Sequence, residues 1–335
     1  MSDAEKQIMH QSKSDQSRHG GTEAIPGLSI VIPVYNEEEN IPEIYRRLKN
    51  VLEQVANDWE IIFVDDGSRD NSAGVIRQIN VADPRVKIIG LSTNLGHQIA
   101  LTAGLDHAEG KMVITMDADL QHPPELIPQL ISRYQEGAEV VQGVKLVQKK
   151  RGWLKILAAF AFYSVICKIL RIQIEPNTSD FRLLSRRVVL LLREMRERHR
   201  FLRGLIPWLG FKIARVEYEA PERFAGQPKY TLRKLASLAL SGVVSFSSVP
   251  LRIFFYLGLV GAFLCVGYAL FAIAAKIFWE AAPSGWASLI VVITFLGSFQ
   301  LIAMGIQGEY LAKVYEEIKR RPLYIIAWKK GFSDD

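Results

Sequence analysis

Cysteine is scarce in this sequence, and two common nucleotide-binding motifs are missing from it. The two cysteines, Cys167 and Cys265, lie in apolar stretches without a metal-ligand type of residue beside them. This pattern argues against a disulfide framework and against a zinc site. No GxGxxG follows the first strand-like segment, and no GxxxxGK[ST] occurs in the chain. A hydride-transferring dinucleotide enzyme and a P-loop NTPase are therefore disfavoured.

A recognisable nucleic-acid-binding motif is also absent, although the formal net charge is +6. The basic residues gather in five groups, at 149–151, 186–187, 193–203, 233–234 and 319–321. Several groups flank hydrophobic segments, which fits contact with an anionic membrane surface better than with a nucleic acid. We therefore expect a lipid bilayer, and no nucleic acid, among the partners.

The first residues of the chain lack the apolar run that a secretory signal peptide needs. They are mostly polar, with charged residues scattered among them. This composition predicts a disordered tail over residues 1–27. It also predicts that the catalytic domain and both termini stay in the cytoplasm.

Strand-like and helix-like segments alternate from residue 28 onward. Strands are expected at 28–34, 59–64, 86–91, 111–116 and 139–143. Helices are expected at 37–55, 72–82, 96–108 and 123–136. Repeated βαβ units predict an α/β fold, with a mostly parallel sheet and helices on both faces. In such sheets ligands bind beyond the carboxyl ends of the strands.

Two carboxylates follow the strand that is expected at 111–116. Asp117 and Asp119 stand at i and i+2, and Gln121 follows at i+4. On extended backbone, alternate side chains share one face, so the three can converge. Their hard oxygen ligands suit Mg²⁺ or Mn²⁺ holding a diphosphate. The alternative is a solvated acidic turn, which the similar motif upstream and the apolar segments downstream disfavour.

A second pair of acids follows the strand expected at 59–64. Asp65 or Asp66 can accept hydrogen bonds from a base or a ribose hydroxyl. Pro33, Tyr35 and Glu37 end the neighbouring strand and are expected to form a wall beside the base. The alternative for the acids is an Asx-type turn that closes a βα loop.

Two downstream segments contain no charged residue over about 23 and about 24 residues, against the ~20 that cross a bilayer. We place two transmembrane helices at about 252–277 and 285–309, within residues 251–311. Cations before the first span and after the second put both ends in the cytoplasm. Residues 312–335 then form a cytoplasmic tail. A buried helical hairpin in a water-soluble protein is the alternative.

Residues 153–170 and 233–250 are apolar segments that include or follow cations. They fit amphipathic helices that lie along a membrane, and equally well core helices of a soluble domain. The catalytic domain is expected over residues 28–232.

Several motifs together resemble the family 2 glycosyltransferases of GT-A fold. They lie at residues 29–38, 64–68, 94–97, 117–124, 179–182 and 223–230, and in the tail at 308–324. Within that family the chain is most similar to the polyprenyl-phosphate glycosyltransferases, which include dolichyl-phosphate mannose synthase. Two C-terminal spans and this tail look most like the bacterial bactoprenol (undecaprenyl-phosphate) glucosyltransferases. The resemblance covers about residues 28–328.

The resemblance implies a metal-dependent enzyme of the bacterial inner membrane. It would transfer a single hexose, with glucose from UDP-glucose favoured, to polyprenyl phosphate for cell-envelope glycan or O-antigen modification. Asp65 and Asp66 would contact the nucleoside, while Asp117, Asp119 and Gln121 would hold the Mg²⁺ or Mn²⁺ and the diphosphate. Family members form homo-oligomers, a tetramer among them. A QxxRW motif, typical of processive relatives, is absent at 148–152, so one sugar per turnover is expected.

The expected acceptor, a lipid phosphate, suggests roles for the remaining candidate site residues. A lipid phosphate already carries oxyanions near neutral pH, because the second pKa of a phosphomonoester is about 6. Ser179, Arg182, Arg223 and Lys229 are expected to gather that phosphate, and Asp180 either orients it or acts as a base. Displacement in one step inverts an α-linked donor to a β-linked product.

Other cations and histidines near these motifs receive weaker roles. For Arg200 and Arg203 we favour a solvated or headgroup contact. His97, Gln98 and His122 are expected to pack or hydrogen-bond near the donor rather than bind a metal. Two alternative functions remain: transfer of another sugar, such as mannose from GDP-mannose or aminoarabinose from its UDP donor, and a non-catalytic nucleotide-sugar-binding membrane protein.

Overall fold

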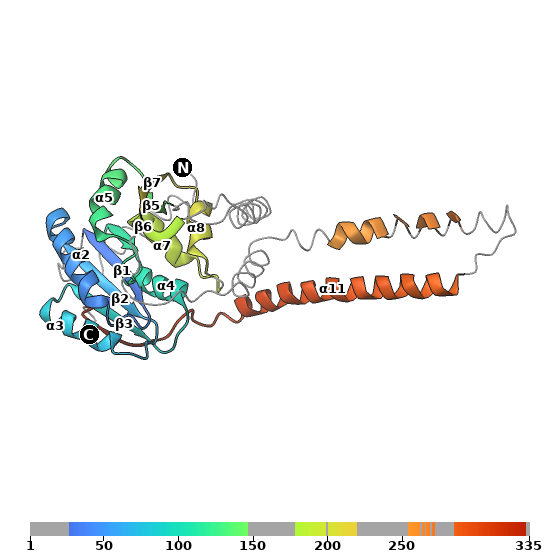
Figure 1. The fold of residues 1–335 in the computed structure, drawn as a ribbon, viewed down its shortest axis with the longest axis horizontal. Coiled ribbons are helices and arrows are strands. Elements are labelled where there is room, and N and C mark those ends of the chain that lie inside the picture. The colour runs from blue at the N-terminus through green and yellow to red at the C-terminus, as the bar shows by residue number, and fades with distance from the viewer. Residues whose placement is uncertain are drawn as a thin grey trace, which may run out of the picture.

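In the computed structural model, a long helix, α11, projects away from an α/β part (Figure 1). Residues 1–26, 147–177, 199, 220–253, 262, 265, 269, 272–284 and 333–335 are not described. The structure thus describes residues 27–146, 178–198, 200–219, 254–261, 263–264, 266–268, 270–271 and 285–332.

A mixed sheet of eight strands forms the centre of the α/β part, in the order β7-β5-β6-β4-β1-β2-β3-β8. Its strands are β1 (Leu28–Val34), β2 (Trp59–Asp65), β3 (Val86–Leu91), β4 (Met112–Thr115), β5 (Val140–Lys145), β6 (Thr178–Ser185), β7 (Ile213–Tyr218) and β8 (Ile326–Lys330). β6 and β8 run against the other strands. The α/β fold with a mostly parallel sheet is confirmed.

Helices cover both faces of the sheet. They are α2 (Ile41–Val55), α3 (Ser72–Ala82), α4 (His97–His107), α5 (Ile127–Gln135), α7 (Arg186–Glu194) and α8 (Leu202–Trp208). Ile30 and Ile32 pack in one core cluster with α2, α3 and α5. Val31 packs in a second cluster with α4, α7 and α8. Alternate residues of β1 thus point to opposite faces, as the pleat of a strand requires.

Most predicted elements lie within two residues of the observed bounds, and the differences have local causes. α2 begins at Ile41 rather than at residue 37, because Asn36 has a φ of 55° and Pro42 stands in the first turn. The predicted strand at 111–116 is shorter, with β4 ending at Thr115. The helix predicted at 123–136 starts as a 3₁₀ turn, η1 (Pro124–Leu126), before α5.

β8 was not predicted, since residues 312–335 were expected to form a tail. It pairs antiparallel with β3 at the edge of the sheet. The Trp328 indole lies against Gly90, where an added Cβ would collide with it. The guanidinium carbon of Arg77 stands 4.0 Å from the centroid of that indole. A glycine on β3 thus makes room for an aromatic ring from the C-terminal segment.

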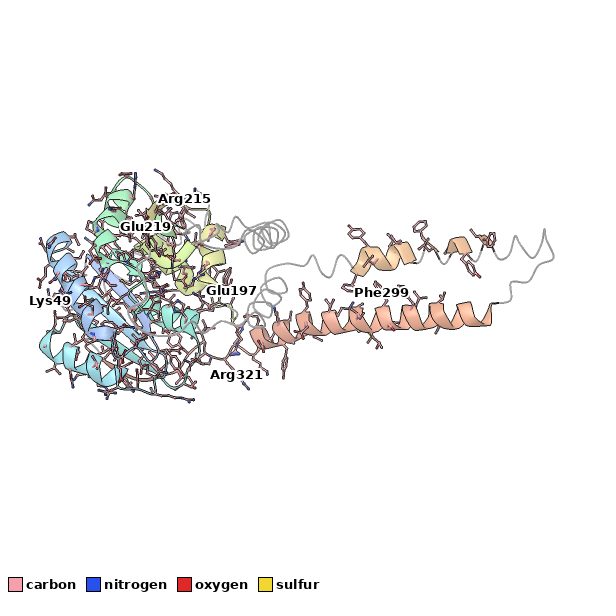
Figure 2. All side chains as sticks on the ribbon, viewed as in Figure 1. Lys49, Glu197, Arg215, Glu219, Phe299 and Arg321 are labelled. Atoms are coloured by element: carbon pink, nitrogen blue, oxygen red, sulfur yellow. The ribbon has the colours of Figure 1, made fainter. Side chains whose placement is uncertain are left out.

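α11 (Trp286–Ile318) is 33 residues long and passes the expected end of the second span at residue 309. Residues 309–318 contain good helix formers and neither glycine nor proline, so the helix continues. Phe299 of α11 faces the helical residues 254–261 (Figure 2). The Phe254 and Phe299 ring centroids are 5.5 Å apart.

Within the described residues, we find no helix that combines the length and the apolar character required to cross a membrane. The segments expected at the interface, 153–170 and 233–250, lie outside the described residues.

Candidate active site

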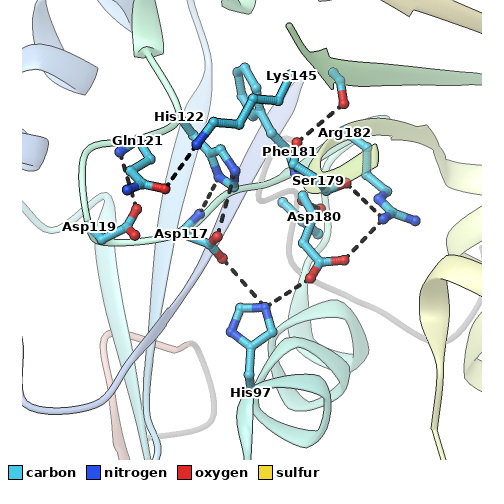
Figure 3. A network of polar contacts seen from close by, with 12 residues as sticks. His97, Asp117, Asp119, Gln121, His122, Lys145, Ser179, Asp180, Phe181 and Arg182 are labelled. Carbon is cyan, nitrogen blue, oxygen red and sulfur yellow. Dashed lines mark hydrogen bonds and ion pairs between the residues drawn. The ribbon is translucent and has the colours of Figure 1, made fainter. Parts of the chain in front are cut away.

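Carboxylates from β2, the segment after β4, and β6 lie at one edge of the sheet. β6 runs antiparallel to β4, and Arg182 is the register partner of Thr115. The first residues of β6 therefore lie beside the carboxyl end of β4. This pairing brings Asp180 close to Asp117, although 62 residues separate them in the sequence (Figure 3).

Asp65 and Asp66 both fix the loops around them. The backbone N–H of Ser68 donates to Asp65 Oδ1 at 3.0 Å. Asp66 accepts hydrogen bonds from the backbone N–H groups of Leu95 at 2.8 Å and Gly96 at 2.9 Å. Burial raises the pKa of Asp66 above its usual range, and the two backbone donors only partly offset that effect. The turn role is confirmed for Asp65, whereas Asp66 binds the loop after β3 instead. The contact of both acids with a nucleoside stays a prediction.

The expected donor wall lies beside this turn. Pro33 is buried in β1, while Tyr35 and Glu37 are half-buried after it. The backbone N–H of Glu37 donates to Ser72 Oγ at 2.9 Å. The segment after β1 is thereby tied to the start of α3. Val34 is the register partner of Asp65, and the backbone N–H of Asp66 donates to Val34 O at 2.9 Å, so the ends of β1 and β2 lie at the same edge of the sheet.

Asp117 is held by a histidine five residues later. Its backbone N–H donates to His122 Nδ1 at 2.9 Å. An accepting Nδ1 places the proton of a neutral imidazole on Nε2, which lies 3.6 Å from Asp117 Oδ2. Burial lowers the pKa of His122, so this neutral form is favoured. The expected hydrogen-bonding role of His122 is confirmed.

Asp119 and Gln121 complete the turn. The backbone N–H of Gln121 donates to Asp119 Oδ1 at 3.1 Å, and Leu120 between them has a φ of 60°. Lys145 Nζ lies 3.4 Å from Gln121 Oε1. Lys145, at the end of β5, was not among the predicted site residues. Its distance in sequence from the turn leaves no local pattern that would reveal it.

Asp180 is the most heavily bonded carboxylate of the site. Arg182 Nη2 donates to its Oδ1 at 3.0 Å, and Arg203 donates to both oxygens, at 3.1 and 2.8 Å. Gln98 Nε2 donates to Oδ2 at 3.3 Å, and His97 Nε2 lies 3.2 Å from the same atom.

These partners determine the charge of Asp180. Burial alone would raise its pKa, but hydrogen bonds from His97 and Arg203, with the charge of Arg182, hold the pKa far below its usual range. A carboxylate that gives up its charge so reluctantly is a weak general base at neutral pH. Its geometry suits the orientation of cations.

The two arginines beside Asp180 differ in exposure. The Arg182 side chain is 2% exposed, and that of Arg203 is 40% exposed. Arg203 therefore joins the buried carboxylate to the surface of the site. The favoured solvated position is wrong for Arg200, which is buried and donates to Thr102 Oγ1 at 3.1 Å. It is wrong in part for Arg203, whose guanidinium binds Asp180.

His97 joins the two halves of the site. Its Nε2 lies 3.4 Å from Asp117 Oδ1 and 3.2 Å from Asp180 Oδ2. Burial opposes protonation of His97, but the hydrogen bond to Asp180 and the charge of Asp117 outweigh it and raise the pKa. A single imidazole thus spans the carboxylate after β4 and the carboxylate in β6.

Ser179 also lies in this network. Its Oγ donates to Gly143 O at 3.2 Å and accepts from the Tyr218 hydroxyl at 3.1 Å. Arg223 and Lys229, the other residues expected to bind the acceptor phosphate, lie outside the described residues.

Asp117 and Asp119 are the candidate ligands of a divalent cation. Among the described residues there is no group of three or more His, Cys, Asp and Glu side chains suited to a metal. Asp117 and Asp119 supply two carboxylates, the number that Mg²⁺ commonly takes beside phosphate oxygens. Asp117 Oδ1 is buried and accepts no hydrogen bond among the described residues, with only the longer contact of 3.4 Å to His97 Nε2. The chemistry of these donors therefore fits a divalent ion.

The chain is similar to known glycosyltransferases in sequence. A model described as "Glycosyl transferase family 2" matches residues 29–190. An uncharacterized glycosyltransferase of Synechocystis is 44% identical over 90% of this chain and 94% of its own length. A protein of Shigella phage SfII named "Bactoprenol glucosyl transferase" is 42% identical over 89% of this chain and 97% of its own length.

Among solved structures, the chain is similar to a glucosyl-3-phosphoglycerate synthase from Mycobacterium tuberculosis, in complex with Mn²⁺, UDP-glucose and phosphoglyceric acid. The identity is 19% and the TM-score is 0.45. The match covers 68% of this chain and 84% of that one.

Proposed function

Because the chain belongs to glycosyl transferase family 2, we propose that it transfers one glucose from UDP-glucose to polyprenyl phosphate. The name of the phage relative supports the sugar and the lipid carrier. The high coverage of both chains supports a shared arrangement of the catalytic part and the C-terminal helices. The lipid-linked glucose would serve cell-envelope glycan or O-antigen modification.

One geometric observation carries this proposal. His97 Nε2 lies within 3.4 Å of Asp117 Oδ1 and 3.2 Å of Asp180 Oδ2. The acids expected on the diphosphate side and the Asp180–arginine group expected on the acceptor side therefore lie next to each other. A transfer between two phosphorylated molecules needs this juxtaposition of anion-binding groups.

The chain's residues then have three tasks. Asp65, Asp66, Pro33, Tyr35 and Glu37 bind and orient the nucleoside of the donor. A divalent ion, Mg²⁺ or Mn²⁺, would be held by Asp117 and Asp119 with Gln121 beside them, and when bound it stabilises the negative charge of the departing diphosphate.

Cations collect the acceptor phosphate on the other side. Arg203, Ser179, Arg223 and Lys229 are proposed to bind its oxygens, while buried Arg182 holds Asp180 in place. An acceptor oxygen forms a bond to the anomeric carbon as the bond to the UDP β-phosphate oxygen breaks, and the bonding pair leaves with UDP. The anomeric centre inverts, so an α-linked donor gives a β-linked product.

A general base is not needed for this step, because the nucleophile is already an oxyanion. The low pKa of Asp180 agrees with a step that needs no general base, because a carboxylate with a low pKa takes up a proton only weakly. We therefore assign Asp180 to orientation of Arg182 and Arg203 rather than to proton removal. Of the two roles that the sequence leaves open for Asp180, the proposal takes orientation.

A membrane location is part of the proposal. We propose that α11 and the segment around 252–277 form a transmembrane hairpin in a bacterial inner membrane, with the catalytic domain and both termini in the cytoplasm. The contact between Phe254 and Phe299 supports the pairing. Large apolar side chains of α11 are exposed, including Leu289, Phe295 and Leu301. We further propose that copies of the chain associate into a homo-oligomer through these helices.

The test uses the full chain in its membrane fraction. Radiolabelled UDP-glucose and short-chain undecaprenyl phosphate are mixed with Mn²⁺ or with a chelator, and label is measured in the organic phase. Metal-dependent label in the lipid supports the proposal. Label from GDP-mannose or a UDP-aminoarabinose donor alone would assign another sugar. Binding of UDP-glucose without transfer to any lipid would favour a non-catalytic binding protein.

A further inference from the structure

The last turn of α7 and the described residues between α7 and α8, 195–198 and 200–201, lie along α4. At the C-terminal end of α4, Arg193 donates to Leu105 O at 2.9 Å and Arg196 Nη1 lies 2.6 Å from Asp106 Oδ2. In the middle, Arg200 Nε donates to Thr102 Oγ1 at 3.1 Å. The segment thus follows α4 toward its N-terminal end.

The same segment ends at the candidate active site. The backbone N–H of Leu202 donates to Gln98 Oε1 at 3.1 Å. The next residue, Arg203, makes the two hydrogen bonds to Asp180. Gln98 also donates to Asp180, so α4 and the start of α8 approach that carboxylate together.

Two residues from the C-terminal part of the chain contact this segment or the acid that it binds on α4. Glu317, in the last turn of α11, accepts a hydrogen bond from the backbone N–H of Arg198 at 2.7 Å. Tyr324, between α11 and β8, donates its hydroxyl to Asp106 Oδ2 at 2.7 Å. The same carboxylate oxygen binds Arg196.

The buried Arg200 is a further anchor of the segment, because its guanidinium donates to Thr102 Oγ1 at 3.1 Å and to Leu192 O at 2.9 Å. The residues before it are less enclosed, since Arg198 is half-buried and Arg196 is exposed. The polar contacts to Asp106 and Glu317 therefore hold residues 196–198, ahead of Arg203.

We propose that Glu317 and Tyr324 are positioning residues, which fix residues 195–198 against α4 and thereby hold Arg203 in contact with Asp180. This inference rests on the proposed function. It assigns the join between α11 and the catalytic sheet a part in the reaction, because Arg203 follows Arg198 by only five positions in the sequence.

The test compares full-length variants in detergent with UDP-glucose and undecaprenyl phosphate. We expect Glu317→Ala to lower kcat by about 3- to 30-fold, the range for coupling through a packed network, with little change in KM for UDP-glucose. Glu317→Gln keeps an accepting oxygen and should restore most of kcat. Glu316→Ala removes the same charge one residue earlier and serves as the control. Tyr324→Phe should resemble Glu317→Ala.

A double-mutant cycle separates positioning from general structural damage. Once Arg203→Ala has removed the guanidinium, Glu317→Ala should have almost no further effect on kcat. Equal fold-losses with and without Arg203 would overturn the inference, as would equal kcat values for Glu317→Ala and Glu316→Ala. If the unmodified chain transfers no sugar to the lipid, the proposed function fails instead.

Discussion

Arg203 binds Asp180 with two parallel hydrogen bonds, Nε to Oδ1 at 3.1 Å and Nη2 to Oδ2 at 2.8 Å. This fork geometry is specific to a guanidinium. The carboxylate is buried, whereas the guanidinium is partly exposed. The pair therefore places a positive guanidinium at the surface of the site, and the buried carboxylate fixes its orientation.

Replacement of Arg203 tests this arrangement. Arg203→Ala should lower the rate of sugar transfer by about 10- to 100-fold, or ~1.4 to ~3 kcal/mol, because a bound phosphate loses a cation. Arg203→Lys keeps the charge without the fork, so its transfer rate should fall between that of the unmodified chain and that of Arg203→Ala. Arg187→Ala, on α7, is the control. Equal rates in all four proteins, measured as label in the lipid phase, would contradict the role of Arg203.

The acids after β4 make a separate prediction. Asp119→Ala should lower transfer by about 100-fold or more, because two carboxylates are needed to hold a divalent ion and its diphosphate. The thermal unfolding midpoint should change little, since Asp119 lies in a turn outside the two core clusters. Glu136→Ala removes an exposed acid elsewhere and should retain full activity.

Binding of the metal ion to the same acids can be measured directly. Calorimetric titration of Mn²⁺ in the presence of UDP should show binding to the unmodified chain and to Glu136→Ala. Heat of equal size from Asp119→Ala would place the ion elsewhere.

The sequence predicts the acids of the site well because each follows a strand of strong local pattern. Asp65 is the last residue of the apolar strand β2 and Asp117 lies two residues after β4, and parallel strands end at the same edge. Arg203, by contrast, reaches Asp180 from 23 residues away through an irregular segment. β8 could not be predicted from a local pattern either, because it pairs with β3, a strand that is far from it in the sequence.

Gly67 offers a test of the loop around Asp66. It has a φ of 68°, and an added Cβ would lie 2.9 Å from the backbone nitrogen of Asn94. Gly67→Ala should lower stability by about 1 kcal/mol or more through the strained backbone. It should also lower activity, because residues 93–96 must move away from Asp66.

Gly137 is the matched control for that substitution. Its φ is 90°, and the nearest atom to an added Cβ is Lys212 Nζ at 4.0 Å. Gly137→Ala should therefore show the backbone strain without the loss of activity. Thermal unfolding and transfer rates on both variants measure the two effects, and parallel losses of activity would argue against a role for the 93–96 loop.

The stability contribution of Asp83 should depend on pH. The Tyr45 hydroxyl donates to its Oδ2 at 3.0 Å, and Arg85 binds both carboxylate oxygens at 2.9 Å. Burial opposes the charge, but these partners hold the pKa of Asp83 below its usual value. The charged form therefore stabilises the fold above the unfolded pKa of about 3.9. That contribution is lost as the pH falls through the lower folded pKa.

Asp83→Asn measures this contribution. At pH 7 we expect a loss of about 1 kcal/mol, reduced by solvent screening because Arg85 is partly exposed. The gap between the unfolding midpoints of the two proteins should narrow as the pH falls below ~4. Glu43→Gln, which breaks an exposed pair with Arg46, should have no measurable effect at any pH. A gap that widens in acid would contradict the assignment.

The placement of β8 after α11 has a consequence for biosynthesis. Synthesis proceeds from the N-terminus, so β3 emerges long before the residues that pair with it. Until Ile326–Lys330 leaves the ribosome, the outer side of β3 is an unpaired strand edge of the kind that recruits other chains. A nascent chain that stalls within α11 would keep that edge open, and one that lacks its final dozen residues would aggregate rather than merely lose activity.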